Sequence, residues 1–250
     1  MFSIRGVLIR SAYTIGGIVF GGLIGILIVK QYIELETKAN SELVAAPLGD
    51  EQEVVIPSEV GNSRECGFDS NSAVIGDYRS LVGEFDPAVG PVDAKVIVVE
   101  YFDPNCPHCK SFHPVLQEVI SRWGLQVRFV FKPIPIWPFS VHQVAALYSA
   151  YQQRRYDALL DAQYAYQRPG GLSLEMLLEL AEQLGMDREK LRKELESGFW
   201  NDYIRWQFDT AVQAGVKSVP TVLINGRFVS SWSRTADCLD QLIMNVLKQF

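Results

Sequence analysis

The chain begins with a long apolar run, after which the period of its hydrophobic positions changes several times. Nineteen uncharged residues, SAYTIGGIVFGGLIGILIV, lie between Arg10 and Lys30. As a helix they would be roughly 28 Å long, close to the ~30 Å hydrocarbon thickness of a membrane. Residues 1–30 are therefore predicted to form a retained transmembrane signal anchor. The alternative is a cleaved signal peptide, which would have a shorter apolar region followed soon by small residues.

Glycine recurs at every fourth position of this predicted helix, at Gly17, Gly21 and Gly25. Small side chains on one face let another helix approach closely, which favours self-association or packing against a partner. The alternative is that glycine is simply common in membrane helices. A weak excess of positive charge before the run favours a cytoplasmic N-terminus, with the bulk of the chain outside.

A polar, mixed segment follows at residues 31–79, and we predict that it is a stalk and N-terminal extension.

From Ala94 onward the pattern of hydrophobic residues becomes regular enough to predict individual elements. The β-branched and aromatic run KVIVVEYF (95–102) predicts a strand that is buried on both faces. A helix over 110–123 and a strand over 125–132 follow, and Cys106-Pro-His-Cys109 stands where that helix begins.

Helical spacing dominates residues 139–214, where Ser173 and Asp187 are predicted helix N-caps, and the period then returns to two. Residues 221–224 and 227–230 predict a hairpin around Asn225-Gly226, a pair that suits a type I′ turn. An amphipathic helix is expected from about Thr235. The order of strand, helix, strand, helical insertion, hairpin and helix predicts an α/β domain over residues 80–250.

Composition and charge exclude several classes of function. The net charge is −6 and no block of Lys or Arg stands out, so nucleic-acid binding is not expected. Four cysteines and three histidines are too few for a disulfide-stapled mini-domain. No cofactor is indicated. His113, one turn after Cys109, is expected to be a surface or partner contact.

The Cys106-Pro-His-Cys109 motif fits thiol–disulfide exchange, which needs an attacking thiolate and a second thiol close enough to resolve the mixed disulfide. At a helix start the first sulfur faces free backbone N–H groups at the positive end of the helix dipole. Pro107 fits the first turn, and His108 adds a donor that favours the thiolate of Cys106. A stabilised thiolate favours the reduced form, which makes the disulfide an oxidant. We expect Cys106 to be the more exposed nucleophile and Cys109 the resolving thiol.

Other uses of the cysteine pair are less consistent with the sequence. A zinc site normally needs a second such pair or spaced histidines, and Cys66 and Cys238 are solitary, so no metal is expected. Covalent attachment of c-type haem needs CxxCH, but position 110 is Lys. A structural disulfide without any exchange role remains an alternative.

Two stretches of the sequence together resemble the DsbA-like thiol oxidases of bacterial envelopes, in the thioredoxin superfamily. They are Glu100-Tyr-Phe-Asp-Pro-Asn-Cys-Pro-His-Cys109 and Gly215-Val-Lys-Ser-Val-Pro-Thr-Val-Leu-Ile-Asn-Gly226. The resemblance covers about residues 80–250 and implies a thioredoxin fold with an α-helical subdomain inserted at about 139–214. It implies that Pro220 is a cis-proline facing the cysteines and that the backbone of Val219 pairs with an extended substrate. Glu100 matches a buried acidic position, and we propose it as a proton relay for Cys109; the alternative is a carboxylate merely hydrogen-bonded at the sheet end.

The predicted function is that of a single-pass protein of the inner membrane whose periplasmic domain donates disulfides to reduced or misoxidised envelope proteins. A membrane thiol oxidase would reoxidise it. Alternatives are a dimeric disulfide isomerase or reductase, and a non-enzymatic, membrane-anchored assembly factor that uses the fold for protein binding. A structural disulfide between Cys66 and Cys238 is the preferred hypothesis for the remaining cysteines. An intermolecular bridge and two free thiols stay open as alternatives.

Overall fold

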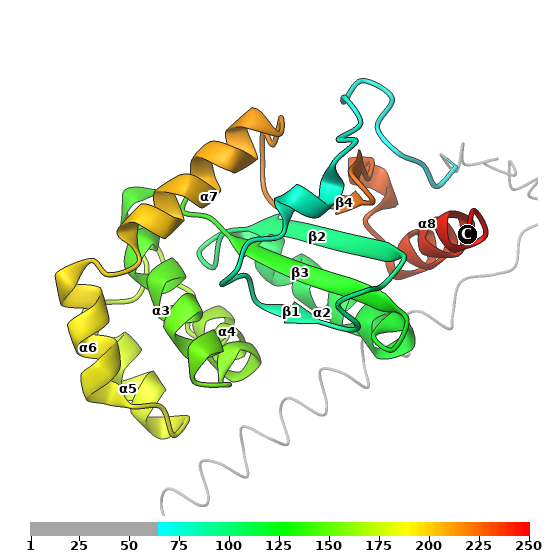
Figure 1. Cartoon of the computed structure of the whole chain (residues 1–250). Coiled ribbons are helices and arrows are strands. Elements are labelled where there is room, and N and C mark those ends of the chain that lie inside the picture. The colour runs from blue at the N-terminus through cyan, green and yellow to red at the C-terminus, as the bar shows by residue number, and fades with distance from the viewer. Residues whose placement is uncertain (1–64) are drawn as a thin grey trace, which may run out of the picture. The chain divides into compact units, whose positions relative to one another are not determined.

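A computed structural model describes residues 65–250, and Figure 1 shows their arrangement. The predicted anchor at 1–30, its glycine face, and most of the predicted stalk lie outside the described residues. Between residues 65 and 250, no helix is both long enough and apolar enough to cross a membrane.

A mixed sheet of five strands forms the centre of the domain, in the order β1-β3-β2-β4-β5. β2 pairs in parallel with β3, and the other neighbouring strands are antiparallel. Every residue of β2 is buried, as its continuous apolar run predicted. The strands are β1 (Ala88–Val89), β2 (Val96–Phe102), β3 (Val127–Pro133), β4 (Thr221–Ile224) and β5 (Arg227–Phe228).

Helices cover both faces of the sheet (Figure 1). On one face Val98 and Phe102 of β2 pack in the same core as α2 (Pro107–Trp123) and α8 (Ala236–Leu247). On the other face Ile97, Val99 and Tyr101 pack with Leu81 of the short helix η1 (Tyr78–Leu81) and with α7 (Asn201–Gln213). The alternation of residues along β2 therefore directs Glu100 to the face that carries α2.

A run of helices separates β3 from β4, and together with the single mixed sheet it confirms the predicted thioredoxin-like α/β fold. Ser173 and Asp187 cap two of these helices through their side chains, as their positions before the helical runs predicted. Gly198 ends one of them in the left-handed region. The elements are η2 (Pro138–Ser140), α3 (Val141–Gln152), α4 (Tyr156–Ala165), α5 (Leu174–Gln183), α6 (Arg188–Ser197) and α7.

The connection from β4 to β5 is the Asn225-Gly226 turn. Both residues have positive φ, 46° and 75°, as a type I′ turn requires. The Asn225 side chain also accepts from the N–H of Ile97 at 2.7 Å and donates to the carbonyl of Lys95 at 3.0 Å. The short η3 (Ser231–Ser233) then leads into α8.

The residues just before the predicted domain pack on this hairpin. Phe68 bridges to Val229, and Cys66 forms a disulfide with Cys238 in α8, with the two Cα atoms 5.1 Å apart. This is the pair proposed from the sequence. Residues 65–79, assigned above to the extension, therefore pack as part of the compact domain.

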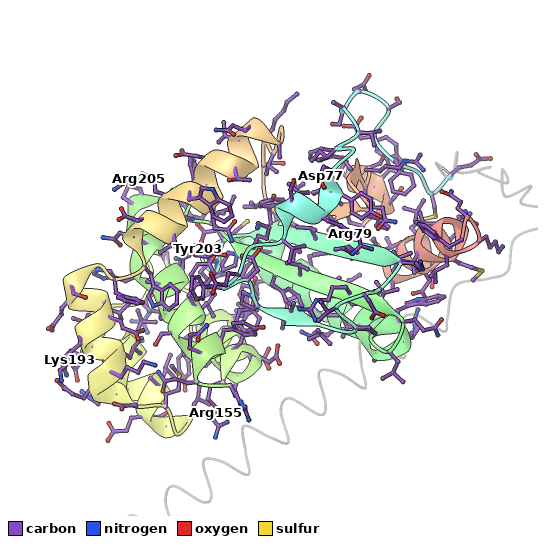
Figure 2. The ribbon with its side chains drawn as sticks, in the orientation of Figure 1. Asp77, Arg79, Arg155, Lys193, Tyr203 and Arg205 are labelled. Carbon is purple, nitrogen blue, oxygen red and sulfur yellow. A yellow bond between two sulfur atoms is a disulfide. The ribbon has the colours of Figure 1, made fainter. Side chains whose placement is uncertain are left out.

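A buried ion pair lies on the sheet face opposite Glu100. Nζ of Lys132 on β3 lies 2.6 Å from Oδ2 of Asp86, and both side chains are fully buried. Asp86 also accepts hydrogen bonds from Tyr203 and Gln207 of α7. Figure 2 shows Tyr203 on the inner side of α7, whereas Arg205 projects outward. No pattern in the sequence indicated this cluster, which joins β3, α7 and the segment before β1.

Candidate active site

Cys106 stands between the carboxyl end of β2 and the first turn of α2. Its backbone N–H donates to the carbonyl of Asp103 at 3.0 Å. Cys106 is the N-cap of α2, and Pro107 occupies the first turn, where its missing N–H costs no helical hydrogen bond. The Cys106 sulfur therefore lies at the helix end whose backbone N–H groups are free to donate to it.

The two thiols of the motif are free and lie in the apolar core. Cys106 is 4% exposed and Cys109 is fully buried. Cys106 is therefore the more exposed of the two thiols, as predicted, although both side chains are buried. A sulfur that approaches from outside meets Cys106 first.

The surroundings of Cys106 favour its thiolate. A hydrogen bond from the Cys109 thiol, supported by the backbone N–H groups of Cys109 and His108 and by the charge of His108, lowers the pKa of Cys106 to about 6, although burial opposes the shift. At pH 7 the thiolate then outnumbers the thiol about tenfold. Cys106 is therefore the thiol that an incoming sulfur meets first, and it is largely ionised at pH 7, as a nucleophile must be.

Cys109 has the opposite tendency. Burial raises its pKa far above the ordinary range, and the hydrogen bond to Cys106 and the charge of Glu100 raise it further. Burial also raises the pKa of Glu100 to about 8. The carboxyl of Glu100 is therefore largely protonated at neutral pH, and it lies close enough to Cys109 for its charge, when ionised, to oppose ionisation of that thiol.

The loop before β4 faces Cys106. The peptide bond between Val219 and Pro220 is cis. The Cys106 thiol points to the carbonyl oxygen of Val219, which is 3.7 Å from the sulfur. The fold therefore brings Val219 and Pro220 beside the cysteine pair, although they lie far downstream in the sequence.

A groove of about 490 Å³ runs between the start of α2 and this loop, and we call it the His108–Arg234 groove. Phe112 and Val115 of α2 contribute its apolar part. It is lined by His108, Ser111, Phe112, Val115, Ser218, Val219, Pro220, Ser231 and Arg234. None of these side chains is acidic.

Arg234 is a site residue that the sequence analysis missed. Its Nη1 donates to the carbonyl of Pro220, and its Nε is buried without a hydrogen-bond partner in the part of the chain that the structure describes. Burial lowers the pKa of its guanidinium, and the charge of Cys109 counteracts that effect. No local pattern marks Arg234, because only the folding of the hairpin brings it to the cysteines.

Asp103 holds the turn that leads to the cysteine motif through hydrogen bonds. This role was not predicted from the sequence. Its carboxylate accepts from the N–H of Asn105 and from the N–H of Ile136, each at 2.7 Å. The amide of Asn105 donates to Ser140 at 3.0 Å. These bonds tie the Cys106 turn to the segment after β3. The DPN turn was the available signal, since Asp often accepts from the backbone two residues ahead.

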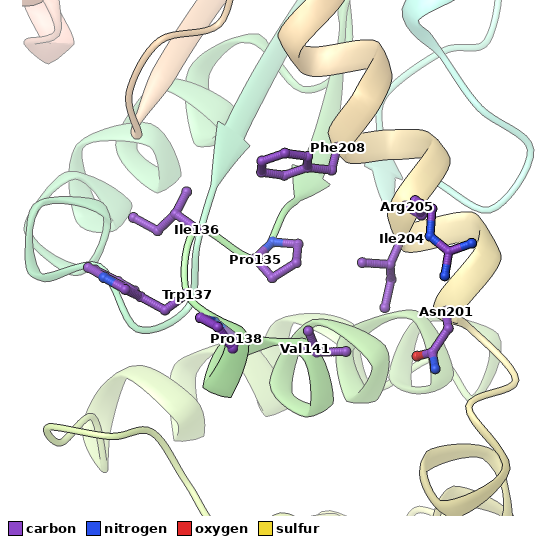
Figure 3. Close-up of a pocket in the computed structure, with 9 residues that line it drawn as sticks. All are labelled: Pro135, Ile136, Trp137, Pro138, Val141, Asn201, Ile204, Arg205 and Phe208. Atoms are coloured by element: carbon purple, nitrogen blue, oxygen red, sulfur yellow. The ribbon is translucent and has the colours of Figure 1, made fainter.

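Two further hollows are lined by the segment after β3. The rings of Trp137 and Phe139 stack with their centroids 5.5 Å apart and line the first hollow with Pro107. Figure 3 shows the second hollow, of about 450 Å³, where apolar side chains from the segment after β3 face α7. Asn201 and Arg205 lie at one end of it.

The expectation for His113 was wrong. Only 12% of its side chain is exposed, and its Nε2 lies 2.9 Å from the carboxylate of Asp161 on α4. Its ring also packs near that of Tyr164. His113 therefore joins α2 to the helical segment and is a contact within the domain.

Comparison with known proteins agrees with this geometry. Residues 84–245 match the family model described as Thioredoxin. Over 148 residues the chain is 30% identical to the Na(+)/H(+) antiporter NhaA 3 of Salinispora tropica, a match that covers 57% of this chain and 22% of the antiporter. The chain thus spans about a quarter of the length of the curated relatives it matches.

Solved structures show the same fold. BdbD from Bacillus subtilis, in its oxidised form, is 20% identical with a TM-score of 0.59, and the match covers 66% of this chain and 94% of BdbD. The thiol-disulfide exchange protein alpha-DsbA2 from Wolbachia pipientis is 19% identical with a TM-score of 0.57, covering 69% of this chain and 92% of that protein.

Proposed function

This chain belongs to the thioredoxin family, and on that basis we propose that it is a protein thiol–disulfide oxidoreductase that donates disulfides through Cys106 and Cys109. The observation that carries the proposal is the contrast between the two sulfurs. Cys106 is the outer thiol and ionises readily, whereas Cys109 is enclosed and resists ionisation. Such a pair suits an exchange in which Cys106 is attacked, carries the mixed disulfide and then leaves as a stable thiolate, while Cys109 is protonated as it departs.

The reaction transfers two electrons from a substrate dithiol to the enzyme disulfide. A substrate thiolate attacks the Cys106 sulfur, the Cys106–Cys109 bond breaks, and its electron pair stays on Cys109. The second substrate thiolate then attacks the first substrate sulfur, and Cys106 leaves as a thiolate. The substrate gains its disulfide and the enzyme becomes a dithiol.

The low pKa of Cys106 supports the oxidising direction. A group that is stable as a thiolate is a good leaving group and favours the reduced enzyme, so the disulfide form accepts electrons readily. The reduced enzyme then needs an oxidant to begin another cycle, and we propose a membrane thiol oxidase for this step.

Glu100 supports the leaving sulfur. Cys109 leaves as a thiolate inside an apolar core, where its raised pKa favours rapid protonation. The Glu100 carboxyl, with a pKa of about 8, holds a proton at neutral pH and shares the same sheet face. We therefore assign Glu100 the role of proton relay for Cys109.

The disulfide between Cys66 and Cys238 supports a location on the oxidising side of a membrane, because structural disulfides persist in oxidising compartments. The domain would be held there, in the periplasm, by the anchor expected at residues 1–30. Alkaline carbonate extraction of membranes, with and without deletion of 1–30, tests the attachment. Release of the intact chain by carbonate would contradict it.

Oxidative refolding of reduced ribonuclease by the full-length protein tests the proposed activity. The wild-type protein should restore ribonuclease activity, and Cys106→Ser should reduce the rate to that of buffer. The equilibrium with glutathione tests the direction, since a disulfide donor should have a potential above about −200 mV. A strongly reducing potential, or full activity of Cys106→Ser, would overturn the proposal.

A further inference from the structure

The His108–Arg234 groove carries a cation, the guanidinium of Arg234. Among residues 65–250, no carboxylate lies within ion-pair distance of Arg234, although the chain as a whole is acidic. The lining contains no acidic side chain, and the second titratable group in it, His108, can only add positive charge. The side chains that line the groove therefore contribute no negative charge to it.

The guanidinium of Arg234 is held in one orientation. Its Nη1 donates to the carbonyl of Pro220 and its Nε is enclosed by the protein. Its Nη2 donates to none of the described residues. An arginine fixed in this way retains a planar donor group with little further entropy to lose on binding a carboxylate.

Arg234 lies in the groove that a substrate bound to Cys106 would enter. Val219, whose carbonyl lies beside the Cys106 sulfur, lines the same groove as Arg234 and His108. A chain that is attached to Cys106 through a mixed disulfide must place the residues next to its cysteine along this groove. The side chains of those residues then lie within reach of the Arg234 guanidinium.

We infer that Arg234 selects substrates that carry an aspartate or glutamate next to the reactive cysteine. The inference rests on the proposed disulfide exchange at Cys106. Its physical reason has two parts. The carboxylate gains a charge-assisted hydrogen bond from Arg234, and the cation offsets the repulsion that an acidic neighbour exerts on the attacking substrate thiolate.

Paired dithiol peptides test this inference with the oxidised full-length protein. Each pair differs only in Glu or Gln beside the reactive cysteine, before it in one pair and after it in the other. Rate constants of peptide oxidation are expressed per thiolate, which removes the difference in ionised fraction, and oxidation by glutathione disulfide gives the intrinsic reactivity ratio of each pair, by which the enzymatic ratio is divided. In at least one pair the wild-type protein should oxidise the Glu peptide about tenfold faster than its Gln twin, a ratio that corresponds to ~1.4 kcal/mol.

Arg234→Met should reduce this ratio to about one, and Arg234→Lys should keep part of it. Lys217→Met is the matched control, because Lys217 is an exposed cation just before the same loop but outside the groove. It should leave the ratio unchanged. Added salt should lower the wild-type ratio, because the attraction is between charges at the surface of a groove.

A wild-type ratio of one in both pairs would overturn the inference, and so would a ratio that persists in Arg234→Met. A loss of rate in Arg234→Met that is equal for both peptides would also overturn it, since Arg234 would then act only by holding the carbonyl of Pro220. Failure of the wild-type protein to oxidise any peptide would instead contradict the proposed function itself.

Discussion

The sulfur of Cys106 lies 3.7 Å from the carbonyl oxygen of Val219, 113 residues further along the chain. A backbone carbonyl beside the reactive sulfur can accept a hydrogen bond from a substrate chain that lies alongside it. The proposed substrate attachment therefore has two parts, a covalent bond to the Cys106 sulfur and a backbone hydrogen bond at Val219.

Trapped mixed disulfides should show this second attachment. In Cys109→Ser, a peptide bound through its cysteine to Cys106 cannot be released by the resolving thiol. Hydrogen exchange of the backbone around Val219 should then slow by about tenfold or more, because pairing with the peptide excludes water. The matched control is the same variant with mercaptoethanol on Cys106, which blocks the sulfur but has no backbone. Equal exchange in the two adducts would exclude strand pairing.

Ionisation of Cys106 should depend most on Cys109. The leading cause of the low pKa of Cys106 is the hydrogen bond from the Cys109 thiol, ahead of the charge of His108. Absorbance at 240 nm should give a midpoint near pH 6 for the wild-type thiolate. Cys109→Ala should raise this midpoint by about one unit, because it removes the donor.

Cys109→Ser is the control for that measurement, since its hydroxyl still donates. Its midpoint should stay closer to the wild-type value than that of Cys109→Ala, and His108→Gln should also shift the midpoint less than Cys109→Ala does. A wild-type midpoint near that of free cysteine, about 8.5, would contradict both the site assignment and the oxidising direction.

Glu100 should make stability depend on pH. Because its pKa is raised from 4.5 to about 8 by burial, the folded protein favours the neutral carboxyl while the unfolded chain favours the carboxylate. The stabilising contribution of the neutral acid is fully present below pH 4.5 and is lost as the pH rises through about 8. Glu100→Gln should therefore raise the free energy of unfolding at pH 9 by on the order of 4 kcal/mol, and hardly at pH 4.

Urea unfolding at the two pH values measures this effect, in a background where Cys106 and Cys109 are Ser so that thiol ionisation does not contribute. Glu84→Gln, at an exposed position, is the control and should change neither value. In the enzyme with both cysteines, Glu100→Gln should slow peptide oxidation at pH 7 by tenfold or more. Unchanged kinetics would leave Glu100 as a buried carboxyl without a relay role.

Short sequence patterns predicted those parts of the domain that depend on residues close together in the chain. The apolar run of β2, the N-caps Ser173 and Asp187, and the Asn225-Gly226 turn each depend on residues within a few positions of one another. The cysteine motif belongs to this class, because its chemistry needs only a strand that ends where a helix begins.

Contacts between distant segments could not be predicted in the same way. Arg234 stands in a polar loop with no motif, and only the hairpin fold brings its guanidinium to Pro220. His113 shares a helix with Cys109, but the packing of α4 against α2 decides that its ring meets Asp161. Sequence spacing gives the face of a helix, and the neighbouring element decides what that face contacts.

The disulfide between Cys66 and Cys238 should stabilise the domain by limiting the unfolded chain. Its cysteines are 172 residues apart, and closing so long a loop contributes up to about 5 kcal/mol in the chain-entropy model. A Cys66→Ser, Cys238→Ser double variant should lose several kcal/mol of unfolding free energy.

Non-reducing mass spectrometry of a variant with Ser at 106 and 109 checks the pairing directly. A peptide that links Cys66 to Cys238 is expected within one chain. Linked peptides from two chains, or two free thiols, would contradict the pairing. The stability of the single variant Cys66→Ser should match that of the double variant, because either change opens the same loop.

Among the charged side chains on the sheet face opposite Glu100, Lys132 should be the one whose removal lowers the free energy of unfolding most. Its Nζ donates to Asp86 and to the carbonyl of Leu81, at 2.6 and 2.5 Å, in a fully buried position. Lys132→Met leaves the carboxylate of Asp86 buried without its cation, a change that costs about 3–5 kcal/mol. Urea unfolding at pH 7 measures it, and Lys110→Met, at an exposed position of α2, should cost less than ~0.5 kcal/mol.

Adding Asp86→Asn to Lys132→Met distinguishes the uncompensated charge from the lost packing of the lysine. Asparagine keeps an oxygen for the hydrogen bonds from Tyr203 and Gln207 but removes the buried negative charge. The double variant should therefore be more stable than Lys132→Met alone by about 1 kcal/mol or more, since the buried charge is the larger penalty. If the second change destabilised the protein further, the role of Lys132 would lie in packing and in its bond to Leu81, and the ion pair would contribute little.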